Sequence, residues 1–190
     1  MNTIEKYIDE FKLLLERIEC TGPGGGILEF PAAIESACTC IYALIASECK
    51  LMFVGNGGSA AIGSHMATDF CRNRRIRALT FNEGTMLTCM GNDFGYEHVF
   101  AKPIELFARK GDCLIAISSS GQSKNILNAV RAARAKDCNV ITLSGFKKDN
   151  PLRAAGDINF YVPVEHYGYV EIIHQYICHA LIDNVREYIL

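Results

Sequence analysis

The chain has 190 residues, 49% hydrophobic and 21% charged, which is typical of one well-buried globular domain. Its formal net charge of -2 argues against nucleic acid as the main partner, because nucleic-acid-binding proteins usually present a basic face. No apolar run reaches the ~18–20 residues of a membrane span, so we expect no membrane association. The chain has nine cysteines, mostly placed singly in apolar segments, and its start does not resemble a signal peptide. These features predict a cytoplasmic protein with reduced thiols.

Two predicted helices precede the first strand. Residues 3–19 place apolar side chains at helical spacing, the glycine-rich segment 21–26 interrupts the pattern, and a second helix is expected from about Pro31 to Cys49. We predict that this helical pair, residues 1–50, is an addition that wraps the core or pairs with a second subunit.

From residue 51 onward, predicted strands and helices alternate. The expected strands are 51–55, 76–81, 113–118, 139–145 and 158–163. The first expected helix follows the turn after strand 51–55 and ends near Cys71, and the others cover about 85–90, 99–109, 122–135 and 169–188. Continuous apolar strands that alternate with helices indicate a parallel sheet covered on both faces. The sequence therefore predicts one α/β domain over 1–190, with a five-stranded, doubly wound parallel sheet in 51–190.

Two turns at strand ends are unusually rich in glycine and serine. The segment GNGGSA (55–60) follows the first predicted core strand, and SSSGQS (118–123) follows the third. In a parallel sheet both turns lie at the carboxyl edge, where ligands bind, and each leads directly into a helix. Free N–H groups and the positive end of the helix dipole favour an anion there.

Serine and glycine also cap helices and form ordinary turns, so one such loop alone says little. Three consecutive serines and a fourth at Ser123 exceed what a cap needs, and we therefore interpret the loop as a phosphate-binding site. The nucleotide-binding pattern that ends in Gly-Lys-Ser/Thr is absent, and so is the dinucleotide pattern G-x-G-x-x-G. Hydrolysis of a nucleoside triphosphate is therefore not expected.

Acidic and imidazole groups recur on two predicted helices. His65 and Asp69 are four residues apart and share one helix face, while the last helix carries Glu171, His174 and His179. Two imidazoles and two carboxylates can bind a divalent metal such as zinc. They can equally move a proton next to a carbonyl group. The residues alone leave these alternatives open.

Four segments together resemble the sugar isomerase (SIS) domain family, and within it the phosphoheptose isomerases. They are GNGGSAAIGSHMATDF, GNDFGYEHVF, AISSSGQSKNILNAVRAARAKDCNVITLSG and HYGYVEIIHQYICHALID. The resemblance implies a flavodoxin-like fold and a homotetramer with active sites between subunits. It also implies conversion of sedoheptulose 7-phosphate to D-glycero-D-manno-heptose 7-phosphate, an early step toward heptose in lipopolysaccharide or capsule.

The resemblance also implies roles for individual residues. Substrate binding falls on Asn56, Gly57, Gly58, Asn92, Asp93, Ser118, Ser119, Ser120, Ser123 and Glu171, with the serines holding the phosphate. Zinc ligands fall on His65, Asp69, Glu171 and His179, with His174 as an alternative to His179. Catalysis falls on Asp69, Glu171 and His179.

Two of these positions depart from the family pattern, which commonly has Glu at 69 and Gln at 171. The Glu at the first position is the family's catalytic base and a metal ligand. Asp69 is one methylene shorter, so its carboxylate is withdrawn by roughly 1–1.5 Å. Glu171 could have taken over as the base.

The first hypothesis is an aldose–ketose isomerase that forms an enediolate. Asp69 or Glu171 removes the proton next to the carbonyl, and His179 moves a proton between the oxygens or to carbon. The alternatives are a non-catalytic SIS module that binds a sugar phosphate or a protein partner, and an isomerase of another sugar phosphate.

Overall fold

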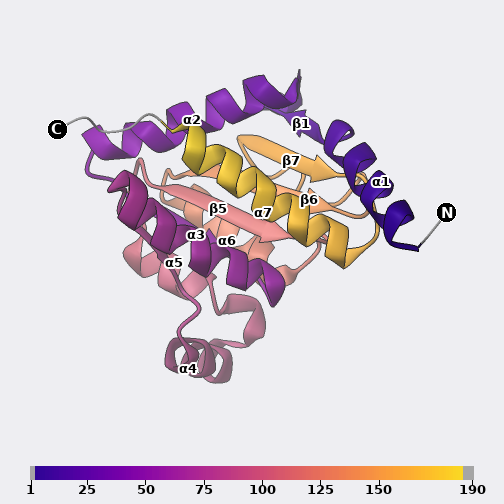
Figure 1. Cartoon of the computed structure of the whole chain (residues 1–190). Coiled ribbons are helices and arrows are strands. Elements are labelled where there is room, and N and C mark those ends of the chain that lie inside the picture. The colour runs from indigo at the N-terminus through magenta and orange to yellow at the C-terminus, as the bar shows by residue number, and fades with distance from the viewer. Residues whose placement is uncertain (1–2, 186–190) are drawn as a thin grey trace.

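The structure, a computed structural model, describes residues 3–185 and places a mostly parallel sheet between two layers of helices (Figure 1). The sheet order is β2-β1-β7-β6-β5-β3-β4. Its strands are β1 (Glu19–Thr21), β2 (Ile27–Leu28), β3 (Leu51–Val54), β4 (Ala78–Thr80), β5 (Cys113–Ser118), β6 (Asn139–Gly145) and β7 (Ile158–Val162). The five predicted core strands are confirmed as β3 to β7, and all of them run parallel.

Two further strands make a seven-stranded sheet, where five were predicted. β1 pairs antiparallel with β7, the last of the parallel strands, placing Cys20 opposite Phe160, and β2 pairs with β1. The glycine-rich break and the 3-10 turn η1 (Pro23–Gly25) therefore connect two short strands. The first helix, α1 (Thr3–Glu16), ends three residues before the predicted Glu19 because that residue already belongs to β1.

Alternate strand residues face opposite helical layers. Leu51 and Phe53 belong to the larger core, which β3 shares with α2 (Phe30–Ala46), α3 (Gly58–Arg74) and α7 (Tyr167–Asn184). Met52 and Val54 face the smaller core, formed with α5 (Ala101–Phe107) and α6 (Lys124–Ala135). Because both faces of β3 are fully buried, its sequence is continuously apolar rather than alternating.

The strand order reverses between β3 and β5. From β3 the chain moves outward to β4, whereas from β5 it moves through β6 to β7 on the other side. The crevice outside the carboxyl ends of two such strands is the usual ligand position in this class of fold. The glycine turn after β3 and the serine loop after β5 both lie there, as the sequence predicted.

α4 (Gly84–Phe94) stands apart from the two helical layers (Figure 1). None of its residues is buried, and Phe94 is 48% exposed. The helix starts at Gly84, where the side chain of Glu83 accepts a hydrogen bond from the Met86 amide and caps it, and it continues four residues beyond the predicted end at residue 90. The turn η2 (Tyr96–His98) follows, and α5 begins at Ala101 rather than at residue 99.

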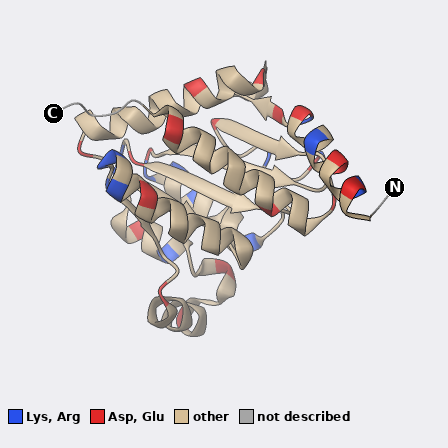
Figure 2. Cartoon of the chain, viewed as in Figure 1, with Lys and Arg blue, Asp and Glu red and all other residues tan. Residues whose placement is uncertain are grey.

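Charged residues are distributed unevenly over the helices. Figure 2 shows acidic and basic residues interspersed along α1. By contrast, α7 has only Glu171 and Asp183 as charged residues, if histidine is counted as neutral. Among residues 3–185, no helix is both long and apolar enough to cross a membrane.

Candidate active site

A small polar pocket lies at the carboxyl edge of the sheet. Its lining comprises Asn56, Ser59, Ile117, Ser118, Ser119, Ser120, Ser123, Tyr167 and Glu171. Its volume is about 110 Å³. Four water molecules occupy a similar volume in the liquid, at ~30 Å³ each. The space suits a phosphate group better than a complete sugar, and all four predicted phosphate-binding serines line it. Larger hollows occur elsewhere on the molecule, but they lack this convergence of hydroxyl groups.

The serine loop has a hydroxyl group without a partner. Ser119 is 5% exposed, and its Oγ has no hydrogen-bond partner within the described part of the chain. An unpaired buried hydroxyl is costly, so this group is a candidate donor to a ligand or a water molecule in the pocket. By contrast, Ser118 Oγ accepts a hydrogen bond from the Gly121 amide at 3.2 Å, and this bond shapes the turn. Gly121 adopts φ +63°, a left-handed conformation that glycine tolerates best.

The glycine turn brings the start of α3 against Glu171. Gly57 adopts φ +53°, and α3 begins at Gly58. A Cβ atom added at Gly58 would lie 2.5 Å from Oε2 of Glu171 and 2.7 Å from its Oε1. The carboxylate therefore sits at the amino end of α3, where the helix dipole favours negative charge. Only glycine leaves room for it there.

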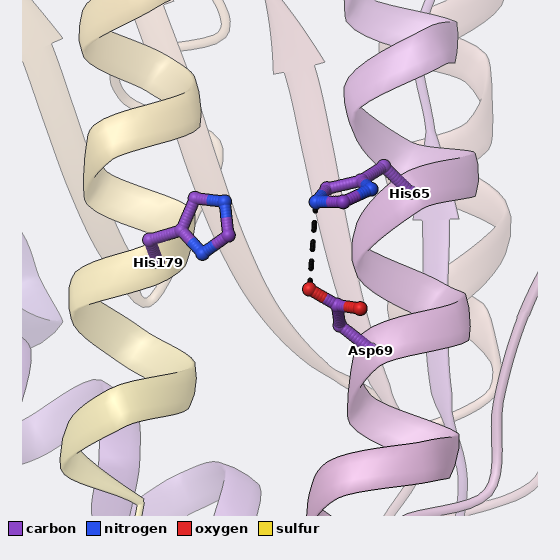
Figure 3. Close-up of side chains that lie close together, drawn as sticks. All are labelled: His65, Asp69 and His179. Atoms are coloured by element: carbon purple, nitrogen blue, oxygen red, sulfur yellow. Dashed lines mark ion pairs between the residues drawn. The ribbon is translucent and has the colours of Figure 1, made fainter.

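A second group of chemically active side chains lies between α3 and α7. His65, Asp69 and His179 each offer a ligand atom, and these atoms all lie within 4.8 Å of one another. His65 Nε2 is 3.4 Å from Asp69 Oδ2, and the rings of His65 and His179 lie 5.5 Å apart. Figure 3 shows both histidines pointing from their helices into the space beside Asp69. Three of the four predicted metal ligands thus come together.

The fourth predicted ligand, Glu171, is not part of this group and instead lines the serine pocket. Residues 58 and 65 on α3 are seven positions apart, and residues 171 and 179 on α7 are eight apart. At 1.5 Å per helical residue, the histidine group lies roughly 10–12 Å from the contact between Gly58 and Glu171. The two helices run parallel, with their amino ends at the serine pocket.

The structure brings His179, and not the alternative His174, to the group with His65 and Asp69. His174 is fully buried, and its Nε2 lies 3.1 Å from the carbonyl oxygen of Ser144 on β6. Burial lowers the pKa of His174 from 6.5 to about 4, so the ring is neutral at physiological pH. Because a carbonyl oxygen can only accept, Nε2 carries the proton. His174 therefore anchors α7 to the sheet.

Asn92 and Asp93 do not line the serine pocket. Both are exposed on α4, and Asn92 Nδ2 donates to Asp93 Oδ1 at 2.9 Å. The segment after α4 nevertheless reaches the pocket, because the hydroxyl of Tyr96 donates to Oδ1 of Asn56 at 3.1 Å. The predicted role of these two residues in substrate binding stays a prediction.

Several residues of this region were not predicted from the sequence. Ser59 and Ile117 also line the pocket, and Tyr167 stands one turn before Glu171 on α7. A sequence signal existed for Tyr167, because residues 167 and 171 have the i,i+4 spacing that puts side chains on one helix face. Asn125 was also missed, and it pairs with Asn56.

The chain matches a known family of protein domains and several proteins of known name. The family model described as SIS domain matches residues 6–145, so the chain is an SIS domain protein. The phosphoheptose isomerase of Edwardsiella ictaluri is 36% identical over 163 residues, which cover 82% of this chain and 83% of that protein. The phosphoheptose isomerase of Yersinia pestis (strain Pestoides F) is 39% identical over 146 residues, covering 73% and 74%. The chain belongs to the phosphoheptose isomerase family of SIS domain proteins.

A solved structure agrees with this assignment over the whole fold. The phosphoheptose isomerase of Neisseria gonorrhoeae superposes with a TM-score of 0.82 and 27% sequence identity, covering 96% of both chains. The predicted SIS family and α/β fold are therefore confirmed.

Proposed function

We propose that the chain is an aldose–ketose isomerase that converts sedoheptulose 7-phosphate to D-glycero-D-manno-heptose 7-phosphate. The observation that carries the proposal is the placement of the serine pocket and the acid–imidazole group on the same pair of parallel helices. An extended seven-carbon sugar phosphate spans about 10 Å from phosphorus to C1, from ordinary bond lengths. This reach matches the rough separation of the two groups along α3 and α7.

The serine pocket would hold the phosphate. The unpartnered hydroxyl of Ser119, the hydroxyls of Ser120 and Ser123, and the amide groups at the start of α6 supply donors without adding charge. Fixing the phosphate orients the sugar along the two helices, so that C1 and C2 reach the acid–imidazole group. Such positioning is a major part of the expected rate enhancement.

The acid–imidazole group would then move the protons. A carboxylate, Asp69 or Glu171, removes the proton next to the carbonyl, which leaves an enediolate. The contact of Asp69 with His65, and the closeness of His179, support Asp69 for this role. His179 then shuttles a proton between O1 and O2 or returns one to carbon. Glu171, which lines the serine pocket, would border the sugar between the phosphate and the reacting carbons.

The donors of the acid–imidazole group fit a divalent metal, and we propose zinc. Two imidazole nitrogens and one carboxylate oxygen are ligands that zinc accepts, with a further position open to a substrate. When bound, the metal would polarise the substrate oxygens and stabilise negative charge on them. His65, Asp69 and His179 would hold it, whereas Glu171, the fourth predicted ligand, lies beside Gly58 at the serine pocket.

We further propose that the active protein is a cytoplasmic homotetramer. The exposed Phe94 on α4 and the exposed Ile172 and Tyr176 on α7 support contacts between subunits. Asn92 and Asp93 lie on α4 outside the pocket of their own chain, and such contacts would allow them to approach the site of another copy.

The direct test is incubation of the purified chain with sedoheptulose 7-phosphate, with and without zinc, following aldose formation. Ser120→Ala should mainly raise KM, whereas Glu171→Gln should mainly lower kcat. Ser36→Ala, an exposed serine on α2 that bonds only within its own helix, is the matched control. Binding of the sugar phosphate without turnover under either condition would contradict the isomerase and favour a sugar-phosphate sensor.

A further inference from the structure

We infer that Asn125 and Tyr96 are positioning residues that fix the side-chain amide of Asn56, so that its Nδ2 presents a hydrogen to the serine pocket. The inference rests on the proposed function, because it treats this pocket as the site of a sugar phosphate. Asn56 lies in the glycine turn after β3, Asn125 lies in the first turn of α6, and Tyr96 lies in η2. Three segments far apart in the sequence therefore meet at one amide group.

The two asparagines form a reciprocal amide pair. Asn56 Nδ2 donates to Asn125 Oδ1 at 3.0 Å, and Asn125 Nδ2 donates back to Asn56 Oδ1 at 2.8 Å. Oδ1 of Asn125 also accepts from the amide of Ile126 at 3.0 Å, and Oδ1 of Asn56 accepts from the hydroxyl of Tyr96 at 3.1 Å. Each amide oxygen thus has two donors, which is its full capacity.

This arrangement determines which way the Asn56 amide points. If the amide of Asn56 were rotated by 180°, its oxygen would face the oxygen of Asn125, and its NH₂ group would face the NH₂ group of Asn125. Both hydrogen bonds of the pair would be lost. The orientation is held from the far side as well, because Asn125 is only 3% exposed and its own oxygen is fixed by the backbone of Ile126.

One donor of Asn56 is left over. Its Nδ2 carries two hydrogens, one of which goes to Asn125, and Asn56 lines the serine pocket. The second hydrogen is therefore available as a neutral donor to an anion in the pocket. Asn125 does not line the pocket, so its influence on a ligand passes through Asn56.

The pair also ties the two anion-binding turns together. Asn125 follows Ser123 by two residues at the start of α6, and Asn56 immediately precedes Gly57 and the start of α3. The serine loop and the glycine turn are thus held in one relative position before a ligand arrives. Preorganised donors of this kind bind an anion without a further ordering cost.

The test is a double-mutant cycle on equilibrium binding, measured by calorimetry with inorganic phosphate and with sedoheptulose 7-phosphate as probes. Asn56→Ala and Asn125→Leu should each weaken binding about tenfold, and Tyr96→Phe about two- to fivefold, the range for losing one or two hydrogen bonds. In the Asn56→Ala background, Asn125→Leu and Tyr96→Phe should change the Kd by less than about twofold. Asn73→Ala, an exposed residue near the end of α3, is the control.

The inference would be overturned if Asn125→Leu and Tyr96→Phe weakened binding by the same factor in the Asn56→Ala background as in the wild type. It would also be overturned if the single variants bound as the wild type does. Tyr96 is 61% exposed, so Tyr96→Phe should fold even if Asn125→Leu does not. In that case the double-mutant cycle of Tyr96→Phe with Asn56→Ala tests the inference. A wild-type chain that binds neither probe refutes the proposed function. In that case the NMR signals of the Asn56 side-chain amide still test the positioning, because Tyr96→Phe should shift them and Asn73→Ala should not.

Discussion

The carboxylate of Glu171 lies against the backbone of Gly58, so the amino-terminal turn of α7 meets the amino-terminal turn of α3. About two turns further along both helices, His179 meets His65. These two contacts hold the helices parallel and make one surface with an anion pocket at its start and an acid–imidazole group at its end. The proposed enzyme depends on this register, because a single sugar phosphate must reach both groups.

Gly58→Ala should disturb the site without unfolding the chain. The added methyl group would lie 2.5 Å from the Glu171 carboxylate, so that side chain must move. We expect kcat/KM to fall about 10- to 100-fold, the range for ångström-scale misplacement of an active-site group. Gly84→Ala is the matched control, because a methyl group there meets nothing within 4 Å. Steady-state kinetics that leave the two variants equally active would show that Glu171 has no part in the reaction.

Ser119→Ala should weaken phosphate binding without lowering the free energy of unfolding. The hydroxyl of Ser119 is buried without a partner, so its removal should leave the free energy of unfolding unchanged or raise it by about 1 kcal/mol. The same change removes a donor from the pocket and should weaken phosphate binding about tenfold. Urea unfolding and calorimetric titration with phosphate measure the two effects. Loss of stability with unchanged phosphate affinity would contradict the assigned role.

The core strands and the two turns at the carboxyl edge of the sheet could be predicted because their signals are local. A buried parallel strand such as Leu51–Val54 is continuously apolar, and a serine- and glycine-rich segment between a strand and a helix marks a turn. β1 and β2 could not be predicted, because three- and two-residue strands carry no periodicity. They exist through tertiary pairing, in which Cys20 is buried opposite Phe160.

The sequence could name candidate site residues, but it could not say which of them lie together. The sequence supplied His65, Asp69, Glu171 and His179, but helical spacing alone could not decide between His174 and His179. That choice depends on the rotation of α7 about its axis, which is set by packing of Ile173 and Ile177 into the core. The reciprocal pair of Asn56 and Asn125 spans 69 positions in the sequence, and only the folded chain brings these amides together.

Asp69→Asn should remove metal binding. The carboxylate of Asp69 is the one anionic donor in the group with His65 and His179, and a neutral amide is a poor zinc ligand. We expect zinc to raise the melting temperature of the wild-type chain and to leave that of the variant nearly unchanged, because a ligand stabilises the state that binds it. Asp9→Asn, at an exposed ion pair on α1, should keep the wild-type response. Equal zinc stabilisation of all three chains would place the metal elsewhere.

His174 should make the stability of the chain depend on pH between about 4 and 6.5. Its pKa is about 4 in the folded state, because burial disfavours the charged ring, and 6.5 is the ordinary value. Between these values the unfolded chain binds more protons than the folded chain, so acid favours unfolding. His174 therefore contributes fully above pH 6.5, and its contribution is lost as the pH falls toward 4. The difference amounts to about 3 kcal/mol of unfolding free energy.

His174→Gln provides the comparison, because its side-chain amide can still donate to the carbonyl oxygen of Ser144 but does not titrate. Urea unfolding of both chains at several pH values should show a shallower pH dependence for the variant, with the two curves converging near pH 4. A wild-type slope that His174→Gln leaves unchanged would mean that the acid sensitivity arises from carboxylates, and that His174 is not buried as a neutral ring.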